Sequence, residues 1–152
     1  MRKFKEIKES AGKLRPVNAS AVKAYADNTS AMAAAVTDVL MQHGDLEQVI
    51  GRGNAAIMAE NHRRHAEFIS SMLENFRPEI FVETLVWVFR TYRARGFAKQ
   101  YWVLQLNAWR DTLSATLETE HARQVDGIYV WMLDNLDDLH ELSSREITVW
   151  EK

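Results

Sequence analysis

The sequence of 152 residues predicts an all-α protein, a helical bundle or globin-sized packing of four long amphipathic helices plus one or two short N-terminal helices. Three observations predict this class. Apolar residues recur with a period near 3.6, as on one face of an α-helix. Glycine, proline and capping residues separate these segments and leave little chain for strands. The content of 47% hydrophobic and 10% aromatic residues is typical of one globular domain with a sizeable core.

The first 17 residues differ in charge from the rest of the chain. They hold six Lys or Arg and two Glu, whereas the whole chain has a formal net charge of -2. Their apolar residues fall at helical spacing, so the segment could be a basic amphipathic arm for an acidic partner, a nucleic acid or a membrane surface: Phe4, Ile7, Ala11 and Leu14. The alternative is a solvated terminus ending at Pro16. We expect residues 1–17 to form a basic, flexible arm and residues 18–152 a single helical domain.

The next helices are predicted from their caps. Ser30 can cap a helix over residues 31–43, which Gly44 can end. Asp45, followed three residues later by Gln48, indicates a short helix that stops in the glycine-rich residues 51–54.

Two long helices should follow. Asn54 can cap a helix that reaches about Asn75, and Pro78 can occupy the first turn of a helix that runs to Arg95 and ends at Gly96. Because residues 78–89 are apolar on nearly every side, we expect other helices to surround this segment at the centre of the fold.

The last two long helices are predicted over residues 97–118 and about 122–142. Each carries an apolar stripe at helical spacing. The first stripe contains Trp102, Leu106, Trp109, Leu113 and Leu117, and the second contains Ile128, Met132, Asn135 or Leu136, Leu139 and Leu142.

Two histidines lie three residues apart within ENHRRHAEF, residues 60–68. His62 and His65 fall on the apolar seam of the predicted helix, where two imidazoles could share a metal ion or face one ligand. The alternative is a structural role, in which each ring nitrogen bonds to a protein group.

Glu83 is a carboxylate inside an apolar segment. If it points inward it needs a cation, a proton or a metal, because an unpaired buried carboxylate is costly. Arg90, seven residues later on the same helical face, could pair with it, and His62 or His65 could reach it from the neighbouring helix.

Aromatic side chains mixed with Arg and Gln concentrate between residues 87 and 109. Such a mixture suits a pocket that stacks a planar molecule and hydrogen-bonds its polar edge, although aromatic residues at helical spacing also suit an ordinary core. The predicted ligand-binding residues are His62, His65, Glu83, Trp87, Arg90, Tyr92, Trp102, Gln105 and Trp109.

A metal site is a weaker hypothesis. A dimetal centre in a helical bundle uses two Glu-x-x-His units and two further Glu residues. Glu118 and His121 form one such unit, and Asp137 and His140 resemble a second one with Asp in place of Glu. The set is incomplete, so the metal candidates are His62, His65, Glu83, Glu118 and His121.

Several function classes find no support. The chain has no cysteine, no apolar run long enough for a membrane span, no secretory signal, no nucleotide-binding or hydrolase motif and no strong nucleic-acid signal. We expect a cytoplasmic sensor or regulatory domain, not an enzyme, that binds a small planar ligand. The alternatives are an interaction protein that forms a homodimer or partner complex, and a His/Glu metal protein. The sequence identifies no cofactor.

Overall fold

The computed structural model of the protein describes residues 3–145. Within this range the prediction of an all-α protein is confirmed, because every regular element is a helix. None of these helices is both long and apolar enough to cross a membrane. The helices are α1 (Phe4–Ala11), α2 (Ala19–Asp27), α3 (Thr29–Met41), α4 (Leu46–Ile50), α5 (Ala55–Glu74), α6 (Pro78–Ala94), α7 (Lys99–Thr116), α8 (Thr119–Asp134) and α9 (Leu136–Ser143).

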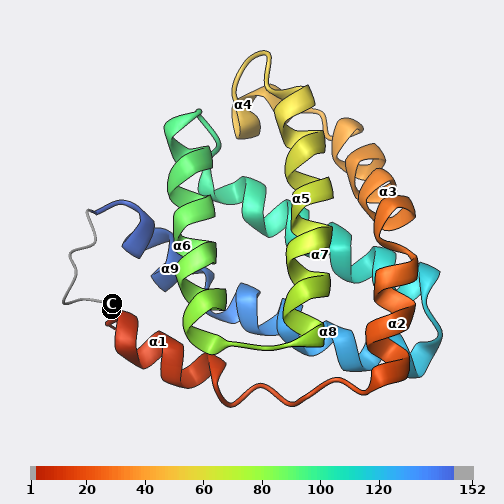
Figure 1. Ribbon diagram of the computed structural model, residues 1–152. Helices are drawn as coiled ribbons and strands as arrows, with labels where there is room; N and C mark the ends of the chain where they lie inside the picture. Colours follow the sequence, from red (N-terminus) through yellow and green to blue (C-terminus); the bar gives the residue numbers. More distant parts are fainter. Residues whose placement is uncertain (1–2, 146–152) are drawn as a thin grey trace.

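Two long helices, α5 and α6, stand side by side and are joined at one end by a short connection (Figure 1). Behind them, α7 and α8 run across the molecule (Figure 1). Helices α2 and α3 pack on α5, and α1 and α9 pack on α6. The helices therefore cross, and residues of α5, α6 and α7 line one cavity.

Residues 4–11 form α1 instead of the flexible arm that we expected. Phe4, Ile7 and Ala11 are buried, and the helix packs on α6. The Ser10 hydroxyl oxygen also accepts a hydrogen bond from Nε1 of Trp131, at 3.1 Å. The helical spacing of these apolar residues is the physical reason, because it gives the segment one face to bury.

Helix α6 is not at the centre, contrary to the sequence analysis. Its inner face is buried, but Trp87 is 60% exposed and Ile80 is 36% exposed. The more central helix is α7, which packs on α3, α4 and α8 and buries Tyr101 and Trp109 completely. Apolar composition alone could not distinguish a surrounded helix from one with exposed apolar residues.

Several predicted helix ends differ in detail. Ser30 lies inside α3, and Asn54 does not cap α5 with its side chain. Nδ2 of Asn54 instead donates to the carbonyl oxygens of Ile50 at 2.8 Å and Arg95 at 2.9 Å. This amide ties the start of α5 to the end of α6. The helix predicted over residues 122–142 is divided at Asn135 into α8 and α9.

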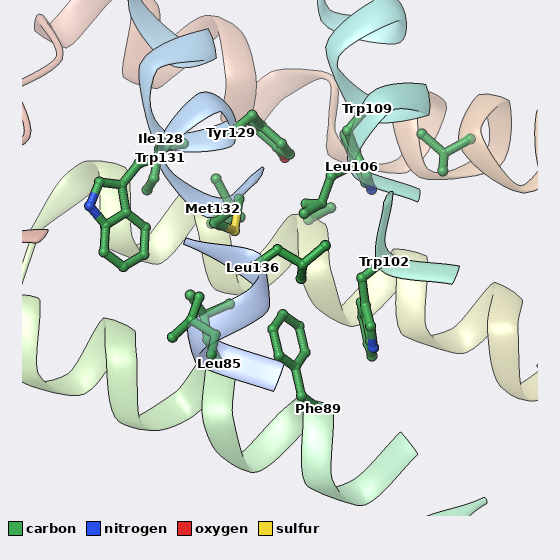
Figure 2. Packing of buried hydrophobic residues seen from close by; sticks show 14 of the residues in the cluster. Leu85, Phe89, Trp102, Leu106, Trp109, Ile128, Tyr129, Trp131, Met132 and Leu136 are labelled. Carbon is green, nitrogen blue, oxygen red and sulfur yellow. The ribbon is translucent and has the colours of Figure 1, made fainter. Parts of the chain in front are cut away.

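The hydrophobic core draws residues from all nine described helices, and part of it lies between α6, α7, α8 and α9. Leu85 and Phe89 of α6 point toward Leu106 and Trp102 of α7 and toward Met132 (Figure 2). Both apolar stripes predicted for α7 and for α8 with α9 are buried, so these stripe predictions are confirmed. This cluster forms the floor of the space between α5 and α6.

Candidate functional site

A cavity of about 730 Å³ lies between α5 and α6. Helix α7 contributes Trp102, Gln105 and Leu106, and α8 contributes Met132. The cavity falls within the size range of small-molecule sites, which are concave and mostly apolar with a few polar groups. Its α5 side consists of Ala56, Ile57, Glu60, Asn61, Arg64, His65 and Phe68, and its α6 side of Thr84, Leu85, Trp87, Val88, Phe89, Thr91, Tyr92 and the following Arg95.

Aromatic rings line much of this cavity. The ring centroid of Trp102 lies 4.5 Å from that of Phe89 and 5.8 Å from that of Tyr92. Trp87 stands at the entrance with its side chain largely exposed, and Phe68 contributes a further ring from α5. Rings around an apolar space suit a flat molecule that can lie against them.

The α7 wall of the cavity carries polar atoms that have no partner within residues 3–145. Gln105 is completely buried, and neither Oε1 nor Nε2 of its side chain is hydrogen-bonded. Nε1 of the nearby Trp102 also has no hydrogen-bond partner within residues 3–145. Buried polar groups are nearly always paired, but Nε1 of Trp109, a residue that does not line the cavity, also has no partner within residues 3–145, so unpaired atoms are not confined to this wall.

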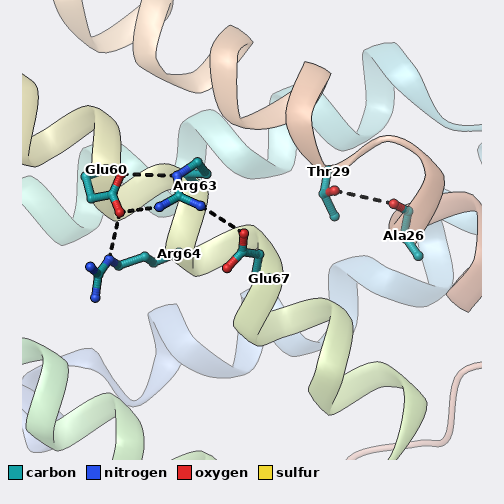
Figure 3. A network of polar contacts seen from close by, with 6 residues as sticks. All are labelled: Ala26, Thr29, Glu60, Arg63, Arg64 and Glu67. Atoms are coloured by element: carbon teal, nitrogen blue, oxygen red, sulfur yellow. Dashed lines mark hydrogen bonds and ion pairs between the residues drawn. The ribbon is translucent and has the colours of Figure 1, made fainter.

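The charged side chains lie at the cavity entrance. Glu60 accepts hydrogen bonds from Arg63 and from Arg64, and Arg63 also bonds to Glu67 (Figure 3). Hydrogen bonds from the two guanidinium groups lower the pKa of Glu60 to about 2. The network holds Arg64 at one side of the entrance, while Arg95 is exposed at the other side.

His65 lies in the α5 wall of the cavity. Its Nε2 is 2.9 Å from the hydroxyl of Tyr129, which is 2.8 Å from the hydroxyl of Tyr25. Its ring also lies against Trp109, with centroids 4.9 Å apart. Burial, with a smaller contribution from the nearby His62, lowers the pKa of His65 to about 3. The imidazole is therefore neutral at physiological pH.

His62 points away from the cavity into a separate hydrogen-bond network. Its Nε2 is 3.0 Å from the Tyr101 hydroxyl, which itself donates to Oδ1 of Asn61 at 2.5 Å. Nδ1 lies 2.7 Å from Oγ1 of Thr37, a hydroxyl that also donates to the carbonyl oxygen of Ala33 at 3.1 Å. The side chain joins α5 to α3 and α7, so the structural alternative for His62 fits its contacts.

Three other predicted residues do not line the cavity. Trp109 is completely buried behind His65. Oε1 of Glu83 faces Nζ of Lys8 in α1, 3.6 Å away, and not a histidine or Arg90. The Arg90 guanidinium donates to the carbonyl oxygens of Ser143 at 3.3 Å and Arg145 at 2.6 Å, so it satisfies the end of α9.

Replacing Arg90 with leucine should lower the free energy of unfolding by about 1–3 kcal/mol, because the carbonyl oxygens at the end of α9 lose their charged donor. Urea unfolding followed by circular dichroism measures this change. The matched control is Arg95→Leu, at an exposed position, with an expected change within about 0.5 kcal/mol. Equal losses in both variants would contradict the role of Arg90.

The metal candidates are not gathered into one site. Glu118 and His121 lie at the start of α8, far along the chain from the cavity residues of α5 and α6. Within the described part of the chain, no group of three or more His, Asp or Glu side chains is arranged to hold a metal ion.

The structure brings together five of the predicted residues: His65, Trp87, Tyr92, Trp102 and Gln105. The sequence analysis missed Phe68, Leu85 and Phe89, which look like ordinary core residues, and Arg64 and Arg95, which look like solvated surface residues. The only sequence signal for Arg64 was its place one residue before His65.

Comparison of the chain with protein-family models, with curated proteins and with solved structures gave no match in any of the three.

Proposed function

We propose that the protein is a sensor or regulatory domain whose cavity between α5 and α6 binds a small, flat and largely apolar molecule. The observation that carries this proposal is the cavity of about 730 Å³ with Trp102, Phe89 and Tyr92 in its walls. A ligand there would contact both α5 and α6, which otherwise pack mainly on different partners. Its binding would therefore stabilise one spacing of these two helices, as a sensor requires.

A cavity-blocking substitution tests the proposal. Ala56 is exposed and lines the cavity, so an indole at this position should obstruct the entrance. We expect Ala56→Trp to weaken binding of 1-anilinonaphthalene-8-sulfonate by roughly tenfold or more, measured by fluorescence titration. This probe combines flat rings with an anionic group that suits Arg64 and Arg95 at the entrance.

The matched control is Ala55→Trp, because Ala55 is exposed on the preceding position of α5 and does not line the cavity. This variant should bind the probe as the unaltered protein does. The proposal fails if the unaltered protein does not bind the probe, or if the two variants bind it equally well.

One observation favours the second hypothesis, an interaction protein. The side chain of Trp87 is 60% exposed, which is unusual for so large an apolar residue. A homodimer through this face of α6 would appear as twice the monomer mass in light scattering, and Trp87→Ala would abolish it. The cytoplasmic location and the His/Glu metal hypothesis stay predictions from the sequence.

A further inference from the structure

We propose that Tyr25 and Tyr129 hold the ring of His65 with its proton on Nδ1, and that the cavity therefore selects a flat ring with a hydrogen-bond acceptor on its edge, such as quinoline. The inference rests on the proposed function and adds the chemical class of the ligand. It depends on the position of one proton, whereas the proposed function depends on the cavity and its rings.

A chain of hydrogen bonds ends at His65. The hydroxyl oxygen of Tyr25 lies 2.8 Å from that of Tyr129, which lies 2.9 Å from Nε2 of His65. Both tyrosine side chains are completely buried, and neither hydroxyl has another hydrogen-bond partner within residues 3–145. The chain links α2 and α8 to the α5 wall of the cavity. Each of its two hydroxyl protons therefore needs an acceptor within the chain itself.

Only one direction of these hydrogen bonds uses both hydroxyl protons. If Tyr25 donates to Tyr129, and Tyr129 donates to Nε2 of His65, each proton has an acceptor. If Nε2–H donates to Tyr129 instead, Tyr129 must donate to Tyr25, and the Tyr25 proton has no acceptor in the described part of the chain. An unpaired buried donor is costly, so the first direction is favoured. A neutral imidazole that accepts at Nε2 carries its proton on Nδ1.

Nδ1 of His65 is accessible from the cavity. The residue is half-buried and lines the cavity. Nδ1 has no hydrogen-bond partner within residues 3–145, yet the unpaired side-chain atoms there that solvent cannot reach belong only to Trp102, Gln105 and Trp109. Nε2 is turned toward Tyr129, which does not line the cavity, and the two ring nitrogens point in different directions. A ligand in the cavity can therefore form a hydrogen bond with Nδ1.

An N–H donor in the α5 wall determines which edge of a ligand fits against it. A ring nitrogen or a carbonyl oxygen accepts from Nδ1–H and pairs with it. An N–H group of the ligand would meet a second donor, and both would stay unpaired. Binding such a ligand would require the proton to move to Nε2, which leaves the Tyr25 hydroxyl without an acceptor. The two tyrosines therefore set the selectivity without contacting the ligand.

Nuclear magnetic resonance tests the position of the proton without any substitution. In a long-range proton–nitrogen correlation spectrum, the nitrogen shift distinguishes a protonated ring nitrogen from an unprotonated one. Near neutral pH we expect Nδ1 of His65 to be protonated and Nε2 to be the acceptor. The signals of His65 are those that are missing from a His65→Gln variant. A proton on Nε2 in the unaltered protein would overturn the inference.

Two flat probes test the selectivity through displacement of 1-anilinonaphthalene-8-sulfonate. Quinoline carries a ring acceptor that is neutral near neutral pH, and indole carries a ring donor. The unaltered protein should bind quinoline roughly fivefold or more tightly than indole, because only quinoline pairs with Nδ1–H.

The matched variants are Tyr129→Phe and Tyr25→Phe, which remove the two hydroxyls of one chain at positions that do not line the cavity. Without the Tyr129 hydroxyl, the His65 proton can move to Nε2 with no loss of a hydrogen bond. The preference for quinoline should therefore fall by roughly threefold or more in Tyr129→Phe. It should stay in Tyr25→Phe, because Tyr129 still donates to Nε2. A purely structural role of Tyr129 would not change the ratio of the two affinities.

The outcomes separate the two proposals. If 1-anilinonaphthalene-8-sulfonate binds but quinoline and indole displace it equally or not at all, the inference about His65 fails and the proposed function stands. A preference for quinoline that persists unchanged in Tyr129→Phe also overturns the inference. If none of the three probes binds the unaltered protein, both proposals fail.

Discussion

Replacing Trp109 with alanine is expected to lower the free energy of unfolding by about 3–5 kcal/mol. The side chain is 0% exposed, and its ring lies against three others, with centroid distances of 4.9 Å to His65, 6.0 Å to Tyr129 and 6.2 Å to Tyr25. These rings belong to α2, α5 and α8, so the substitution opens a void where three helices meet on α7. Such a void cannot be refilled without moving the helices.

Chemical denaturation followed by circular dichroism measures this loss. The matched control is Trp87→Ala, the same substitution at a position that is 60% exposed, with an expected change within about 0.5 kcal/mol. Similar destabilisation by the two substitutions would mean that burial does not determine how much Trp109 contributes to the free energy of unfolding.

Acidification is expected to destabilise the protein between about pH 6.5 and pH 4. Burial lowers the pKa of His62 from 6.5 to about 4, so in this range the unfolded chain binds a proton that the folded protein does not. Folding is therefore most favoured above pH 6.5, and this contribution is lost as the pH falls. For His62 alone the loss from pH 7 to pH 4 is about 3 kcal/mol. His65, with its pKa also lowered by burial, acts in the same direction.

Urea unfolding at a series of pH values measures this dependence, and a His62→Gln variant provides the comparison. Glutamine does not titrate, so the free energy of unfolding of the variant should change less between pH 7 and pH 4. Below about pH 4.5 the free energy of unfolding of the variant should still fall with pH. The reason is that hydrogen bonds from arginine hold the pKa values of Glu60 and Glu120 near 2 in the folded protein. An unchanged slope above pH 4.5 in the variant would contradict the role of His62.

The candidate site could be predicted from the sequence in part. Aromatic, Arg and Gln residues between residues 87 and 109 indicated a pocket, and Trp87, Tyr92, Trp102 and Gln105 line one cavity. Arg90 belongs to the same stretch but bonds to the end of α9, because side chains one or two residues apart on a helix point to different sides and so meet different neighbours. Spacing along one helix does not specify which helix faces it.

The two histidines also show that spacing along one helix does not specify the neighbours of a side chain. Their spacing placed both on the inner side of α5, yet His62 bonds to Tyr101 and Thr37 while His65 bonds to Tyr129 beside the cavity. The partners lie 25 to 64 residues away along the chain. The choice between them depends on how α3, α7 and α8 cross α5.

The sequence by itself determined the helical class, most helix locations and the buried stripes of α7, α8 and α9, because hydrophobic periodicity, glycine and proline act locally. Only the tertiary structure decided that α1 packs on α6, that α6 exposes Trp87, and that Gln105 lies buried and unpaired at the back of a cavity. These features arise from contacts between segments far apart in the chain. Burial and pairing of a side chain are properties of that packing, and no local pattern contains them.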